Sequence, residues 1–174
     1  MLTEVFIREK NEYKEVEITD PNKPAVSVDI LSKWKRLVNS TAEILAVPAV
    51  LIMKIRKDAM EVFLSSDNSE NPYSAGDSET LGHGLYCENV IGTNKVLLVE
   101  NALESDVWND NPDVDLNMIA YYGLPIRWPD GQTLGTICVL DNESNKFEEK
   151  YREMIKIYQK VIEDDLELLL CRNE

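Results

Sequence analysis

The sequence has few residues of the kinds that most enzymes and metal sites need, and each shortage excludes a class of function. Its 174 residues include one histidine, His83, and three scattered cysteines, Cys87, Cys138 and Cys171, without a C-x-x-C pair. A Ser-His-Asp triad would have to use His83, which stands between two glycines in a chain that has no G-x-S-x-G motif. The cysteine pattern indicates neither a disulfide framework nor a zinc site, so we expect reduced thiols.

Basic charge is also scarce. The chain carries 18 Lys and Arg against 32 Asp and Glu, a formal net charge of −14. Such a surface repels phosphate backbones and anionic lipid headgroups, so we expect no nucleic acid and no membrane surface as a partner. No apolar run approaches the roughly 20 residues of a membrane span, and no signal peptide follows Met1. The expected location is therefore cytoplasmic.

The length fits one domain, since domains average roughly 150 residues. Pro21 and Pro24 near the start of the chain are expected to break any regular helix or strand there. We therefore expect a leader at 1–24, compatible with a short hairpin or an irregular segment, one domain at 25–170 and a tail at 171–174.

The stretch from Ala120 to Asp141 is the most informative part of the chain. Two apolar runs flank the turn sequence Trp128-Pro129-Asp130-Gly131, in which proline presets φ and glycine accepts a positive φ. Each run is apolar on both pleat faces, with Leu134 expected on the face of Cys138. A strand with one wet face would alternate with polar residues, so the pattern predicts a hairpin in the middle of a sheet covered on both sides.

Other segments predict the elements around this hairpin. Ser27 or Asp29 can cap an amphipathic helix that ends before Pro48, and Val50–Ile55 with Met60–Leu64 forms a second hairpin. A short helix, 86–91, is closed by Gly92. The last helix begins at Phe147 with Asn145 as its cap and exceeds 20 residues. Asp165 interrupts its apolar seam. Its far end, 166–170, is a candidate contact with a second copy of the chain or a continuation toward another module.

Two irregular polar segments, 65–79 and 101–119, separate these elements. The first is long for a loop in a compact domain, and such loops often cover a site or are mobile. The second is rich in carboxylates, and we expect Asp106, Asp110, Asp113 and Asp115 to form a solvated acidic face.

Several short stretches occur in an order typical of one family. They are YYGLPI at 121–126, DG at 130–131, LGTICVLD at 134–141 and Phe147, preceded by YCENVI at 86–91, LLV at 97–99 and Asn111-Pro112 with Val114. Over about Val28 to Leu169 the chain resembles the GAF domain, the small-molecule-sensing relative of the PAS fold. It is similar to the GAF domains found ahead of histidine kinases and diguanylate cyclases.

The resemblance implies an α+β fold with a central antiparallel sheet of five or six strands. The N- and C-terminal helices would cover one face, and the loops and short helices between 65 and 119 would cover the other and enclose a ligand pocket. It also implies a sensory or regulatory role in signal transduction without catalysis, with an unidentified small-molecule ligand, no assigned cofactor, a homodimer through the terminal helices and a histidine kinase or diguanylate cyclase as output partner.

Aromatic and thiol side chains are the candidate ligand contacts. They are Tyr73, Tyr86, Cys87, Trp108, Tyr121, Tyr122 and Cys138. The aromatic members fit a pocket lining and a packed core equally well. Cys87 and Cys138 also fit small buried hydrophobes.

Two alternatives stay open at this stage. The first is a ligandless dimerisation scaffold, which would be favoured if aromatic side chains filled the pocket or if Tyr121 and Tyr122 both packed fully against helices. The second is a redox enzyme of the free methionine sulfoxide reductase type, a GAF relative that uses a cluster of active-site cysteines. This chain has no matching set.

Overall fold

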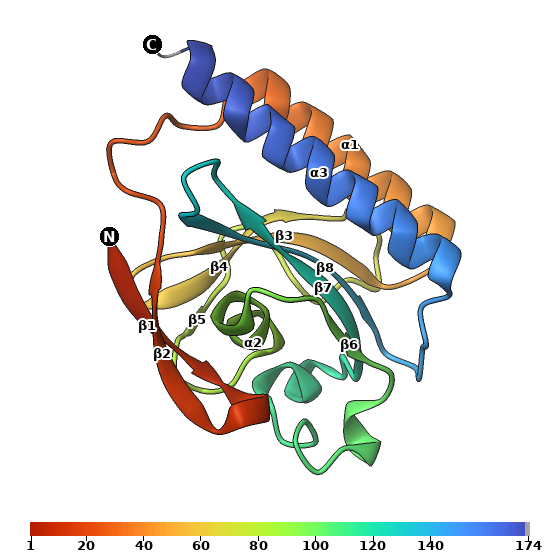
Figure 1. Ribbon diagram of the computed structural model, residues 1–174. Helices are drawn as coiled ribbons and strands as arrows, with labels where there is room; N and C mark the ends of the chain where they lie inside the picture. The colour runs from red at the N-terminus through yellow and green to blue at the C-terminus, as the bar shows by residue number, and fades with distance from the viewer. Residues whose placement is uncertain (173–174) are drawn as a thin grey trace.

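The computed structural model describes residues 1–172 and has three layers built on one sheet (Figure 1). The sheet has six antiparallel strands in the order β5-β4-β3-β8-β7-β6. These strands are β3 (Ala49–Ile55), β4 (Ala59–Ser65), β5 (Ser78–Thr80), β6 (Leu97–Val99), β7 (Ala120–Arg127) and β8 (Thr133–Asp141). Helices α1 (Val28–Leu45) and α3 (Glu149–Arg172) cover one face, and α2 (Tyr86–Thr93) lies on the other (Figure 1). The predicted fold class is confirmed.

The β7–β8 hairpin lies in the interior of the sheet, as predicted. Trp128 N–H donates to the carbonyl of Gln132 at 2.8 Å, and Gly131, at φ +94°, donates to the carbonyl of Trp128 at 2.9 Å. Every residue of β8 is buried. The prediction of a sheet covered on both faces is therefore confirmed.

The two faces of this hairpin carry two separate cores. Tyr121 and Cys138 pack on the α2 side, whereas Tyr122 and Ile137 pack on the side of α1 and α3. Leu134 was expected beside Cys138 but belongs to the α1/α3 core. The register shifts where Ile126 faces Gly135 and Arg127 faces Thr133, so one extra residue in β8 interrupts the alternation.

The helix termini agree with the predictions in part. Ser27 caps α1, its hydroxyl accepting from Ile30 N–H at 3.4 Å. The last helix begins at Glu149 rather than Phe147, because Phe147 has φ +47° and its N–H bonds the side chain of Asn145 at 2.7 Å. In the expected tail at 171–174, residues 171–172 end α3 and residues 173–174 lie outside the described part of the chain.

The segment before α1 forms the hairpin alternative rather than an irregular leader. Strands β1 (Leu2–Ile7) and β2 (Glu12–Glu17) pair through η1 (Arg8–Lys10) and lie beside α2 (Figure 1). Gly92 is a packing site and not the predicted cap, since a Cβ there would come within 2.4 Å of Ile7. The left-handed C-cap of α2 is Asn94.

Over residues 1–172, no helix combines the length and apolarity that crossing a membrane requires.

Candidate functional site

A cavity of about 290 Å³ lies on the α2 side of the sheet. Its walls come from strands β3, β4 and β5, the loop at 72–77, the start of α2, and η3 (Pro112–Leu116). The lining residues are Met53, Met60, Val62, Pro72, Tyr73, Asp77, Ser78, Glu79, Leu85, Cys87, Pro112, Asp113 and Leu116. Its volume is close to the lower end of those of small-molecule sites.

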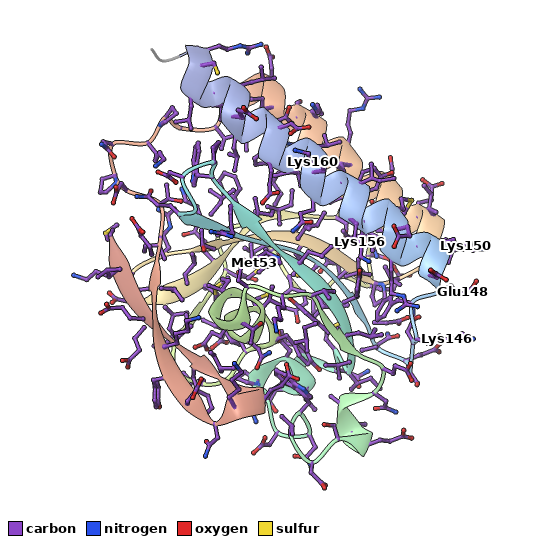
Figure 2. The ribbon with its side chains drawn as sticks, in the orientation of Figure 1. Met53, Lys146, Glu148, Lys150, Lys156 and Lys160 are labelled. Atoms are coloured by element: carbon purple, nitrogen blue, oxygen red, sulfur yellow. The ribbon has the colours of Figure 1, made fainter. Side chains whose placement is uncertain are left out.

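The floor of the cavity is apolar. Met53, Met60 and Val62 project from the sheet, and Leu85 and Cys87 belong to the start of α2. Figure 2 labels Met53 where the sheet faces α2. Such a floor would bury the hydrocarbon part of a ligand.

A hydrogen-bonded pair forms the polar wall. Tyr73 Oη donates to Asp113 Oδ1 at 2.8 Å. Asn71 orients Tyr73, because its side-chain oxygen accepts from Tyr73 N–H at 2.8 Å, and Asn111 does the same for Asp113 N–H at 2.9 Å. These short Asx turns fix the backbone of the two residues within segments that have little regular structure.

The charge of the lining is negative. Asp77, Glu79 and Asp113 contribute three carboxylates, and the lining includes no Lys or Arg. Desolvation raises the pKa of Asp113 to about 6, with a further increase from the nearby Glu79, although the bond from Tyr73 lowers it. An anionic ligand would be repelled here, whereas a neutral or cationic one would not.

An aromatic stack fills the space next to the cavity. The rings of Tyr86 and Tyr121 are stacked at 4.6 Å between centroids, and Trp108 lies 5.1 Å from Tyr86. Tyr86 Oη donates to the carbonyl of Met118 at 3.1 Å. All three residues are buried and none lines the cavity.

Of the two buried thiols, Cys87 lines the cavity and Cys138 lies behind its floor. Thr136 Oγ1 donates to Cys87 Sγ at 3.3 Å, and Tyr121 Oη lies 3.3 Å from the same sulfur. Burial raises the pKa of the Cys138 thiol well above its usual value, with an additional effect of Cys87. Cys138 is therefore a neutral thiol, which is a poor nucleophile.

The structure brings only some of the seven candidate residues to the cavity. Tyr73 and Cys87 line it, and Tyr86, Trp108, Tyr121 and Cys138 belong to the same core behind it. Tyr122 lies on the opposite face of the sheet, against Phe147. His83 is exposed.

Sequence reasoning missed Asp113, which was expected to be solvated with its acidic neighbours. Asp106, Asp110 and Asp115 are exposed, but Asp113 is half-buried in the cavity. The preceding Asn111-Pro112 was the available signal, because Asn followed by Pro at N1 begins a helical turn and fixes the orientation of the next residue. Within residues 1–172, no group of three or more His, Cys, Asp or Glu side chains is arranged to hold a metal ion.

Comparisons with known proteins point to one family. The family model of the GAF domain matches residues 29–162. No curated protein matches the chain. Among solved structures, the GAF domain of an Acinetobacter phosphoenolpyruvate-protein phosphotransferase is similar, with 17% identity and a TM-score of 0.65 over 84% of this chain and 87% of that one.

Two further structures have the same fold at lower identity. The blue-light absorbing form of the Thermosynechococcus elongatus PixJ GAF domain is 13% identical, with a TM-score of 0.61 over 83% of this chain and 89% of that one. The type II free methionine-R-sulfoxide reductase of Thermoplasma acidophilum is 10% identical, with a TM-score of 0.61 over 79% and 92%. One fold therefore accommodates a photoreceptor and an enzyme, and only the site can indicate function.

Proposed function

Since this chain belongs to the GAF domain family, we propose that it is a sensory domain of signal transduction that binds a small molecule in the cavity beneath η3. The observation that carries the proposal is the form of the cavity, an apolar floor facing the hydrogen-bonded pair of Tyr73 and Asp113. Binding pockets typically combine such a floor with a few fixed polar groups.

The charge of the cavity restricts the ligand. Three carboxylates without a lining cation favour a neutral or cationic molecule with an apolar part. Of the seven candidates, we propose direct contacts for Tyr73 and Cys87. Tyr86, Trp108, Tyr121 and Cys138 would instead support the wall from behind.

The loops and η3 that cover the sheet would exist in more than one conformation, and a ligand would favour the conformation that binds it best. Tyr121 of β7 belongs to the core behind the cavity, and the other face of β7 packs against α3, so we propose α3 as the route to an output partner. Exposed apolar residues on α1 and α3, namely Val28, Ile44, Ile157 and Leu168, favour a homodimer through these helices. A histidine kinase or diguanylate cyclase in the cytoplasm is the proposed output.

A ligandless scaffold is the second candidate. The stacked rings of Tyr86, Tyr121 and Trp108 occupy much of the space under the loops, and Tyr121 and Tyr122 are both fully buried. These observations favour a filled core without a ligand. The cavity of about 290 Å³ that these rings leave open favours a sensor.

A redox enzyme is a weaker candidate, because the Cys138 thiol is buried with a raised pKa. We propose that the domain is not an enzyme. An assay with free methionine sulfoxide and a thiol reductant tests this, and we expect no turnover that the Cys87→Ser and Cys138→Ser variants could lose.

Native mass spectrometry of the purified protein separates the first two candidates. Ser78 is exposed in β5 at the mouth of the cavity, so Ser78→Trp should obstruct it, and Ser74→Trp, at an exposed position outside the lining, is the matched control. A sensor predicts a bound small molecule after incubation with a metabolite pool, lost in Ser78→Trp and kept in Ser74→Trp. A scaffold predicts the mass of the bare chain in all three proteins.

A further inference from the structure

A second, smaller cavity lies on the opposite face of the sheet and is not part of the site described above. Its volume is about 160 Å³, and it lies between the edge strand β6 and the first half of α3. Leu98 of β6 pairs with Tyr122 of β7 to form its wall, and Arg152 and Lys156 line it from α3.

Two residues that line this cavity each have a buried polar atom with no hydrogen-bond partner among residues 1–172. They are Tyr122 Oη and Arg152 Nε. Tyr122 is 1% exposed, so its hydroxyl has no direct access to bulk water. Buried polar groups are nearly always satisfied, and an orphaned pair that lines one cavity indicates an absent partner.

The missing partner must supply acceptor atoms. A guanidinium group only donates, and a phenol hydroxyl can donate to the same acceptor. None of the ion pairs formed within residues 1–172 includes Arg152, although Glu149 and Glu153 also line the cavity. Glu153 is already paired with Lys156, at 3.1 Å.

At the cavity itself the cations are matched by carboxylates, since Arg152 and Lys156 line it together with Glu149 and Glu153. Residues 146–160 carry five Lys and Arg against three Glu, whereas the whole chain has a formal net charge of −14. Figure 2 labels Lys150, Lys156 and Lys160 along α3 and Lys146 just before it. Lys156 is paired with Glu153, so Arg152 is the lining cation that forms no ion pair within residues 1–172, and it would attract an anion.

We propose that this cavity binds a small free oxyanion, a carboxylate or a phosphate. Tyr122 Oη–H and Arg152 Nε–H would donate to its oxygen atoms. The cavity accommodates one such group with few further atoms and is too small for a nucleotide. The site is independent of the sensory cavity, which has three carboxylates and no cation in its lining.

The test is a nuclear magnetic resonance titration of the Arg152 Nε–H signal with phosphate and, separately, acetate, against chloride at the same ionic strength. Arg152→Lys identifies the signal by its loss. Tyr122→Phe removes only the hydroxyl and keeps the ring that packs on Phe147. Lys150→Gln is the matched control, since it removes one charge from the same helix at an exposed position outside the cavity.

We expect a saturable shift with phosphate or acetate, a midpoint about tenfold higher in Tyr122→Phe, and an unchanged midpoint in Lys150→Gln, because one charge-assisted bond is lost only in the first variant. If only phosphate or only acetate gives a saturable shift, that result identifies the ligand as a phosphate or as a carboxylate. The proposal is overturned if chloride has the same effect, if Tyr122→Phe responds as the unmodified protein does, or if neither oxyanion gives a saturable shift, since water would then be the partner.

Discussion

Asp165 of α3 accepts a hydrogen bond from the indole N–H of Trp34 of α1 at 2.9 Å, inside the core between the two helices. Its other oxygen accepts from Lys33 Nζ at 2.9 Å. The acidic residue that interrupts the apolar seam of α3 therefore joins the two terminal helices. Both helices lie together on one face of the sheet (Figure 1).

Removing this carboxylate should destabilise the domain. Asp165→Ala leaves the indole N–H buried without an acceptor, and we expect a loss of about 1–3 kcal/mol in the free energy of unfolding, measured by urea denaturation. Asp164→Ala is the control, because Asp164 is exposed and pairs with Lys160 at the surface, and it should change stability by less than about 0.5 kcal/mol. Equal losses in the two variants would contradict this role.

Gly135 is required by the close approach of β8 to β3. A Cβ at this position would lie 1.7 Å from the carbonyl oxygen of Met53. We expect Gly135→Ala to cost more than about 4 kcal/mol, a large part of the roughly 5–15 kcal/mol that stabilises a typical domain. Circular dichroism, followed during urea denaturation, measures this loss in the free energy of unfolding. Gly76→Ala meets no atom within 4 Å and has only the strain of φ +96°, about 1–2 kcal/mol, so this control should stay folded.

The stability of the domain should depend on pH through Asp113. Its pKa is about 6 in the folded state against about 3.8 in the unfolded chain, so the folded state binds more protons between these values. Stability therefore falls as the pH rises through this window and does not fall further above it. Asp113→Asn keeps a side-chain oxygen that accepts from the Tyr73 hydroxyl. Because the amide does not ionise, this variant should not lose stability as the pH rises through the window.

The measurement is the difference in free energy of unfolding between Asp113→Asn and the unmodified protein, from pH 3.5 to 8. We expect the difference to grow in favour of the variant by about 1–3 kcal/mol up to pH 6, since one pKa unit corresponds to roughly 1.4 kcal/mol. Asp115→Asn, at an exposed position of the same η3 turn, is the matched control for the change of charge. A difference that is constant with pH would contradict the burial of the Asp113 charge.

Exposed apolar residues of the terminal helices should decide the oligomeric state. Ile157 is 62% exposed and Leu168 is 50% exposed on α3. Light scattering coupled to size exclusion should show a dimer for the unmodified protein and a monomer for Ile157→Glu, because a buried unpaired carboxylate would oppose association. Leu103→Glu, at a 57% exposed position on η2 (Ala102–Glu104), should leave the dimer intact. A monomer at every concentration of the unmodified protein would exclude the proposed interface.

The sequence was sufficient for the fold because the signals that specify it are local. The turn at Trp128–Gly131 and the apolar runs beside it predict β7 and β8 without knowledge of distant contacts. Helix ends were less predictable. Phe147 looks like the first residue of α3, but its burial beneath the helix holds it at a positive φ that no helical residue adopts.

The candidate site was less predictable because distant segments build it. Tyr73 and Asp113 are 40 residues apart, and their bond depends on the path of two irregular segments. A stricter use of strand geometry would have separated two candidates, since adjacent residues of a strand point to opposite faces and Tyr121 and Tyr122 could not share one cavity. Which of the two faced α2 depended on the packing of the helices.

The most direct test of the sensory function is a thermal denaturation screen of neutral and cationic metabolites on the unmodified protein, Ser78→Trp and Ser74→Trp. A ligand at a hundred times its Kd should stabilise the folded state by about 2.7 kcal/mol. We predict that at least one compound raises the Tm of the unmodified protein and of Ser74→Trp but not that of Ser78→Trp. No shift with any compound, or a shift that Ser78→Trp retains in full, would contradict binding in the cavity beneath η3.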